Sequence, residues 1–156
     1  MQQILTATPV LTATPVQKSP FHPGAAAATV ADIMRPPLTT VGQHDHVAAA
    51  AYLMKHAGAT ALVVVGDEQA RRPLGLITEA DIVRAVADGK ELNDVRIRDL
   101  MTTDPTVITA ATSVRDAAES MLAGHFRHLP VVDDGSLIGI VDIADVSRAL
   151  LDPPSG

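Results

Sequence analysis

Cysteine is absent from the 156-residue sequence, and only three residues are aromatic: Phe21, Tyr52 and Phe126. Without cysteine the chain has no disulfides, no thiolate zinc sites and no thiol nucleophiles. The net charge is −6 and there is no basic block. Because the chain also offers almost no aromatic side chains on which bases could stack, nucleic acid is not expected as a partner.

Long apolar runs are also missing. No stretch approaches the roughly 18 residues that span a membrane, and the N-terminus lacks the basic start and apolar run of a signal peptide. We therefore expect a cytoplasmic protein with no membrane partner. The composition, 47% hydrophobic and 19% charged, is typical of soluble globular proteins. With so few aromatics, the core must be aliphatic.

The beginning of the chain differs from the rest. Its first 24 residues contain four prolines, a direct hexapeptide repeat and a single charged side chain, Lys18. Proline at this density prevents helix formation and interrupts sheet pairing. We expect a disordered, proline-rich tail over residues 1–29 and a short C-terminal tail over residues 152–156.

The remainder of the sequence is a duplication. Segments of the first half recur in the same order, first at an offset of 67 residues and then, after one turn, at an offset of 64. The matching segments are residues 32–34 and 99–101, 62–65 and 129–132, and 75–82 and 139–146. A length change confined to a turn is tolerated by two copies of one folded unit. The copies are expected over residues 30–92 and 93–151.

Each copy has the pattern of an extended segment, a helix, two strands and a second helix. In the first copy, Asp45 is placed to cap a helix that Gly58 ends. In the second, Ser113 and Asp116 predict a helix start and Gly124 predicts its end. A unit of about fifty residues is marginal alone, so the two copies should bury their sheets against each other.

These duplicated motifs, Asp-h-Met (h, apolar) followed by Gly-h-h-x-x-x-Asp, resemble the cystathionine-β-synthase (CBS) domain pair, or Bateman module, over about residues 30–151. The resemblance implies an α/β fold of two β-α-β-β-α repeats packed about a pseudo-twofold axis. It implies a regulatory module that binds an adenosine-containing ligand between the repeats, requires no cofactor and is not an enzyme. AMP, ADP or ATP is expected ahead of NAD or S-adenosylmethionine. The family also implies a homodimer that acts on a separate, unidentified protein.

In this family the ligand motif is Gly-h-x-Thr/Ser-x-x-Asp, and the first copy matches it with Gly75, Thr78 and Asp81. The Thr78 hydroxyl and the helix N-terminus suit a phosphate, and the Asp81 carboxylate can accept both hydrogens of a ribose diol. Thr78 and Asp81 also form an ordinary capping pattern. Both interpretations stay open at this point.

The second copy departs from the motif because Asp142 stands where Thr78 stands. A carboxylate facing a phosphate is unfavourable by about 1–4 kcal/mol, depending on the local dielectric. We therefore interpret Asp142 as a helix cap and expect one nucleotide per chain, bound at the first motif. Asp145 still matches the ribose position, so a nucleoside could bind there.

Other positions follow from the resemblance. Arg127 and His128 lie where family members carry basic residues that reach the phosphates, although Arg127 could instead pair with Asp133 or Asp134. The segments expected to frame the adenine follow each Asp-h-Met motif, at Thr39, Thr40 and Val41 in the first copy and at Thr106, Val107 and Ile108 in the second. The apolar residues that could sandwich the base are Val64, Ile77, Val131 and Val141. Short apolar runs of this kind are more often simply core.

Other classes of function have weaker support. The histidine pairs at positions 44 and 46 and at 125 and 128 lack a nearby carboxylate set, so we expect no metal site. None of the serines has the context of a catalytic nucleophile. The main alternative is a scaffold that dimerises or docks a partner without any ligand. The degraded second motif favours this alternative, and intact Thr78 and Asp81 oppose it.

Overall fold

The structure, a computed structural model, describes residues 28–37, 39–66 and 71–152. The expected tails, residues 1–29 and 152–156, lie outside this part of the chain apart from Ala28, Thr29 and Asp152.

The elements follow the duplicated order that the sequence predicts. The first copy supplies α1 (Val30–Ile33), β1 (Thr40–Gly42), α2 (Val47–Ala57), β2 (Ala61–Val65), β3 (Pro73–Thr78) and α3 (Glu79–Ala87). The second supplies a 3₁₀ turn (Ile97–Asp99), β4 (Thr102–Thr103), β5 (Ile108–Thr109), α4 (Val114–Gly124), β6 (His128–Asp133), β7 (Ser136–Asp142) and α5 (Ile143–Leu151). The predicted α/β fold of two similar units is confirmed.

The predicted helix ends are close to the observed ones. Gly58 ends α2 in the left-handed conformation, with φ 61°. The N-cap of α2 is His46 rather than Asp45, whose carboxylate instead accepts a 2.7 Å hydrogen bond from the Gly42 amide. Ser113 caps α4 as expected, and α4 continues through Gly124 to a left-handed His125.

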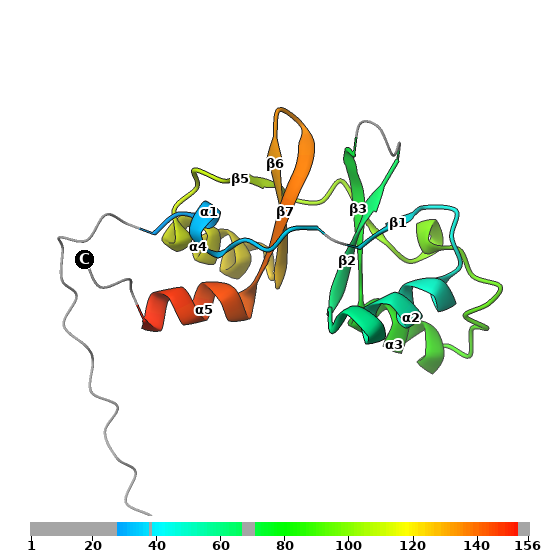
Figure 1. The fold of residues 1–156 in the computed structure, drawn as a ribbon. Helices are drawn as coiled ribbons and strands as arrows, with labels where there is room; N and C mark the ends of the chain where they lie inside the picture. Colours follow the sequence, from blue (N-terminus) through cyan, green and yellow to red (C-terminus); the bar gives the residue numbers. More distant parts are fainter. Residues whose placement is uncertain (1–27, 38, 67–70, 153–156) are drawn as a thin grey trace, which may run out of the picture.

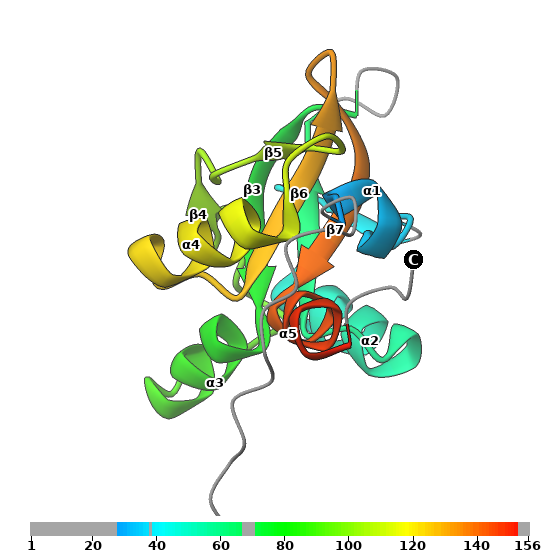
Figure 2. The same ribbon diagram turned by 90° about the vertical axis from the view of Figure 1, so that its left-hand side faces the viewer.

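Two sheets form the centre of the molecule. In one the strand order is β1-β2-β3-β4, and in the other it is β5-β6-β7. Figure 1 shows the β2–β3 and β6–β7 hairpins side by side in the middle, with α2 and α3 on one flank and α1, α4 and α5 on the other. Figure 2 shows the same hairpins one behind the other. Between the sheets lies an apolar cluster of Val63, Val65, Leu76 and Leu137, packed with Ile140. The two copies therefore bury their sheets against each other, as expected.

The two copies exchange the segments that lead into them. Residues 28–35, the first leading segment, lie against the second copy: Val30 belongs to the core cluster of Met121 and Val141, and Arg35 exchanges two 2.9 Å backbone hydrogen bonds with Ile140. Residues 97–106, the second leading segment, lie against the first copy, since β4 pairs with β3. Each packed unit thus contains residues from both sequence copies, and the boundaries 30–92 and 93–151 stay a prediction.

Two glycines allow this exchange. A Cβ on Gly75 would lie 2.6 Å from the Thr102 carbonyl oxygen and 2.9 Å from Met101 Sδ. A Cβ on the equivalent Gly139 would lie 3.2 Å from the Arg35 carbonyl oxygen and 2.9 Å from Met34 Sδ. The repeated glycine and methionine of the two motifs are therefore packing partners across the exchange, which explains why both recur.

Candidate functional site

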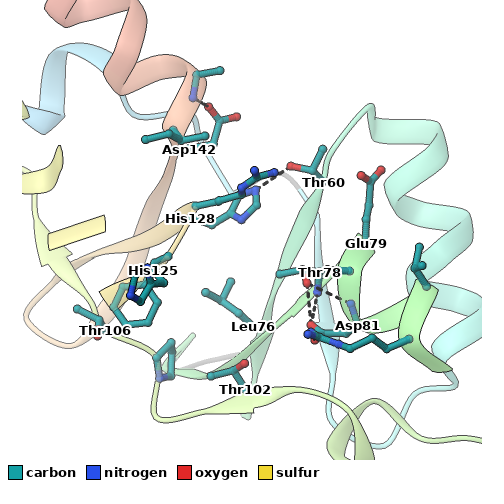
Figure 3. A pocket seen from close by; sticks show the side chains of 18 of the residues that line it. Thr60, Leu76, Thr78, Glu79, Asp81, Thr102, Thr106, His125, His128 and Asp142 are labelled. Carbon is teal, nitrogen blue, oxygen red and sulfur yellow. Dashed lines mark hydrogen bonds and ion pairs between the residues drawn. The ribbon is translucent and has the colours of Figure 1, made fainter. Parts of the chain in front are cut away.

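A cleft of about 930 Å³ opens between the two copies on the side of α3. Its walls come from the start of α3, from the second leading segment and from the residues that precede and follow the β6–β7 hairpin. Figure 3 shows Thr78 and Asp81 on one side, His125 and Thr106 on another, and Asp142 and His128 at the far end. Both sequence copies are needed to build it.

Thr78 and Asp81 form the capping box that begins α3. Asp81 Oδ2 accepts 2.8 Å hydrogen bonds from the Thr78 amide and hydroxyl, while the Asp81 amide donates to Thr78 Oγ1 at 3.3 Å. Asp81 Oδ1 accepts a 2.5 Å hydrogen bond from Arg84, whose side chain is 71% exposed. The capping interpretation is therefore correct. The second carboxylate oxygen, Oδ1, takes no part in the cap and is bound by the exposed Arg84 side chain.

The helix N-terminus offers less to a phosphate than the motif suggests. The Glu79 amide already donates to the Thr60 carbonyl at 3.0 Å, and the Asp81 amide is satisfied by Thr78. The Thr78 hydroxyl donates to Asp81. Thr78 consequently positions the Asp81 carboxylate, and its expected role at a phosphate stays a prediction.

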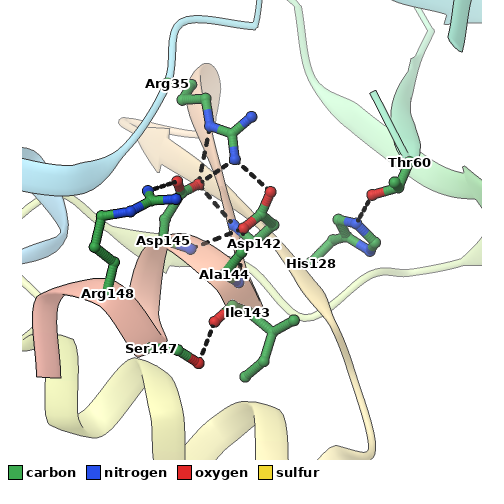
Figure 4. Close-up of polar contacts among 9 residues, drawn as sticks. All are labelled: Arg35, Thr60, His128, Asp142, Ile143, Ala144, Asp145, Ser147 and Arg148. Carbon is green, nitrogen blue, oxygen red and sulfur yellow. Dashed lines mark hydrogen bonds and ion pairs between the residues drawn. The ribbon is translucent and has the colours of Figure 1, made fainter. Parts of the chain in front are cut away.

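His128 lies at the far end of the cleft and joins the two copies. Its Nε2 is 2.7 Å from the Thr60 hydroxyl (Figure 4). Burial lowers the pKa of His128 below its ordinary value, and Arg127 and Arg35 lower it further against the opposing charges of Asp142 and Glu79. The side chain is therefore neutral at neutral pH. The expected contribution of His128 to phosphate binding stays a prediction.

Arg127 is the remaining basic residue of the predicted pair. It lines the cleft, and its carbonyl accepts a 2.9 Å hydrogen bond from the Ile143 amide, which fixes its backbone at the start of α5. Within the described part of the chain it forms no ion pair with Asp133 or Asp134. Its guanidinium is thus available to an anion in the cleft.

Four of the residues expected to surround the adenine, Thr40, Val41, Val64 and Ile77, do not line this cleft. Val41, Val64 and Ile77 are 4%, 0% and 0% exposed and belong to the aliphatic core of the first copy. Thr40 lies in β1, at the opposite edge of the sheet from β4. The cleft takes its wall instead from the second leading segment, at Thr102, Asp104, Pro105 and Thr106. Of the residues expected at the adenine, Thr106 lies in this wall, because the exchange of segments brings the second leading segment, and not β1, to the cleft.

Asp145 lies away from this cleft, at the start of α5 (Figure 4). Its Oδ2 accepts hydrogen bonds from Arg35 Nε at 3.0 Å and Arg35 Nη2 at 2.7 Å. Arg35 Nη2 also contacts Asp142 Oδ2. Asp142 caps α5 as expected, because its Oδ1 accepts from the Ala144 and Asp145 amides at 2.8 and 2.9 Å. Sequence reasoning missed Arg35. The equivalent residue, Thr102, is uncharged, so the duplication itself gave no sign of a charged side chain at this position.

Lowering the pH tests the partial burial of His128. Because its pKa in the folded protein lies below the ordinary value of 6.5, the unfolded chain takes up the proton more readily. The contribution to stability is complete above about pH 6.5 and declines as the pH falls, by at most about 1.4 kcal/mol per pH unit. The melting temperature should therefore fall less between pH 7.5 and 5.5 in His128→Gln than in the unaltered protein. Equal falls in the two proteins would contradict this.

Within the described ranges, no group of three or more histidine, aspartate and glutamate side chains is arranged to hold a metal ion. In the same ranges no helix is long and apolar enough to cross a bilayer.

Comparison with known proteins identifies the family. The model of the CBS domain matches residues 30–88 and 97–152, so the chain belongs to the CBS domain family and carries two such domains in tandem. Hypoxic response protein 1 of Mycobacterium tuberculosis is 32% identical over 123 residues, which are 78% of this chain and 85% of that protein. Two archaeal relatives are longer: the chain spans 61% of the length of a Methanopyrus kandleri protein and 42% of a Methanocaldococcus jannaschii protein.

Solved structures share the fold. CBSX2 in complex with AMP is 33% identical with a TM-score of 0.65, covering 79% of this chain and 96% of the other. The CBS domain pair of MJ0100, in complex with 5′-methylthioadenosine and S-adenosyl-L-methionine, is 28% identical with a TM-score of 0.72, covering 80% and 97%. Hypoxic Response Protein I, with two coordinated zinc ions, is 30% identical with a TM-score of 0.67, covering 77% and 97%.

Proposed function

We propose that this protein binds an adenine nucleotide in the cleft beside α3 and is a regulatory module rather than an enzyme. The observation that carries the proposal is the position of Asp81 Oδ1, which lies in a cleft that Arg127 also lines. The complexes of CBSX2 with AMP and of MJ0100 with S-adenosyl-L-methionine support an adenosine-containing ligand.

The contacts suggest which part of the ligand meets which residue. Asp81 Oδ1 can accept the two hydroxyl hydrogens of a ribose once the exposed Arg84 side chain moves aside. Arg127 can then pair with a phosphate, a charge-assisted contact that is strong where water is partly excluded. The side chains of Val83 and Ile143, which also line the cleft, offer apolar surface to the base.

The charge of the cleft favours a ligand with few phosphates. Its lining includes the carboxylates of Glu79, Asp81 and Asp104, besides Asp142, which is paired with Arg35. The guanidinium groups that line it are those of Arg84 and Arg127. Each further phosphate would face this excess of negative charge. We therefore place AMP before ADP and ATP, with NAD and S-adenosylmethionine as further candidates.

The module would report ligand occupancy to a separate protein, and we propose that it acts as a homodimer in the cytoplasm. The alanine-rich helix α2 offers a weakly charged outer face for self-association, and Tyr52 on it is largely exposed. The alternative is a ligand-independent scaffold.

A thermal-shift panel separates these two functions. AMP at about 100 times its dissociation constant should stabilise the fold by roughly 2.7 kcal/mol, which raises the melting temperature by several degrees. AMP, ADP, ATP, NAD, S-adenosylmethionine and adenosine should be compared. Asp81→Asn should abolish the shift, and Arg127→Met should weaken AMP more than adenosine.

Asp116→Asn is the matched control, since Asp116 lies in the first turn of α4 as Asp81 does in α3, outside the cleft. It should leave the AMP shift unchanged. A panel in which no compound moves the melting temperature at millimolar concentration would reject the nucleotide proposal and favour the scaffold.

A further inference from the structure

Arg35 enters the second copy at the position that corresponds to a wall of the cleft. The backbone of Arg35 pairs with Ile140 in β7, as the backbone of Thr102 pairs with Leu76 in β3. Thr102 lines the first cleft. By the internal symmetry, the side chain of Arg35 occupies the equivalent place in the second copy, where it reaches Asp142 and Asp145.

The two copies differ here in two positions that are complementary in charge. The aspartates Asp81 and Asp145 each have an arginine three residues later, Arg84 and Arg148. Around this shared pair, the packed unit that contains Asp81 has threonine at positions 78 and 102. The packed unit that contains Asp145 has Asp142 and Arg35 in their place. Asp142 and Arg35 contact each other directly, so the added negative charge and the added positive charge neutralise one another.

We propose that Arg35 is a built-in counter-ion that closes the second cleft, so that the module takes one nucleotide per chain. This rests on the proposed function. The second cleft is the place beside Asp142 and Asp145 that corresponds to the first by the internal symmetry. Figure 4 shows the guanidinium between the carboxylates of Asp142 and Asp145, and Asp145 is the residue that would bind a ribose. A nucleotide would have to displace Arg35 and would then bring its phosphate against the uncovered Asp142 carboxylate.

The charge state of the group supports the closed arrangement. The hydrogen bond to Asp145 raises the pKa of Arg35, so its guanidinium is charged at every physiological pH. Burial acts to raise the pKa of Asp142, but hydrogen bonds from the Asp145 and Ala144 amides and the charge of Arg35 outweigh it and hold this pKa below its usual value. Both partners are ionised, and Asp145 is 8% exposed.

Calorimetric titration with AMP tests the proposal. The unaltered protein should bind one AMP per chain. R35T/D142T gives the second cleft the residues of the first, and it should bind two. R35T alone uncovers Asp142 and should still bind one, as should R148M, which removes a neighbouring cation without opening the cleft. Two sites in the unaltered protein, or one in R35T/D142T, would overturn the proposal.

Ligand-free unfolding separates the failure of this proposal from the failure of the proposed function. If the unaltered protein binds no AMP, the nucleotide function fails, and a double-mutant cycle of R35M and D142N decides the role of Arg35. Asn retains a capping oxygen at position 142. R35M should lower the melting temperature by about 2–6 °C, and the loss should be smaller in the D142N background. Strictly additive losses would overturn the closed arrangement.

Discussion

Gly75→Ala should lower the free energy of unfolding by about 3 kcal/mol, the upper part of the range for overpacking, and Gly139→Ala by only about 1 kcal/mol. Both new methyl groups meet a flexible methionine sulfur at 2.9 Å. They differ in the backbone they meet: the Thr102 carbonyl at 2.6 Å against the Arg35 carbonyl at 3.2 Å. A carbonyl within a strand pair cannot move aside without weakening the pairing of β3 with β4.

Urea unfolding of the two variants measures this difference, and each glycine variant is the control for the other. Because Thr102 also lines the cleft, Gly75→Ala should in addition weaken AMP binding, whereas Gly139→Ala should not. If the two variants lose equal stability, the argument fails, because the two leading segments would then approach their sheets equally closely.

The second large effect is expected from Ile77→Ala, at about 2–5 kcal/mol of unfolding free energy. Ile77 is fully buried beside Val47, Leu62 and Val64, so truncation leaves a cavity in the core of the first copy. Its side chain does not line the cleft. The AMP dissociation constant of the folded variant should therefore change less than about twofold.

Measuring stability and affinity together separates a core residue from an adenine contact. Leu129→Ala, in the core of the second copy, is the matched control and should be similarly destabilising with unchanged affinity. A large loss of AMP affinity in Ile77→Ala alone would restore the earlier hypothesis that this residue packs against the base.

The sequence predicted the fold well because its signals are local and occur twice. Gly58 and Ser113 mark helix ends through backbone geometry and capping, and these depend on neighbours within a few residues. The apolar runs at residues 61–65 and 129–132 need only be buried to become strands. Duplication made each weak pattern stronger, since the same order recurs at a fixed offset.

The site could be predicted only in part, because its walls come from residues distant in sequence. Thr78 and Asp81 were found because they are three residues apart on one helix. The contribution of Thr102 depends on a strand pairing between copies, and the partner of Asp145 is 110 residues away. A strand pairing between the copies and an ion pair between distant residues leave no pattern among neighbouring residues, so the sequence alone does not reveal them.

The exchange of leading segments also sets the order in which the chain can complete its fold. Val30 must find Thr112, and Arg35 must find Ile140, before the second sheet is covered. The two residues of each pair are far apart in the sequence. A fold with many such distant pairings has a high contact order and forms slowly. During synthesis, residues 28–35 therefore remain without these native partners until the chain up to Ile140 has left the ribosome. The first amino acids of the globular part to be made are thus among the last to reach their final positions.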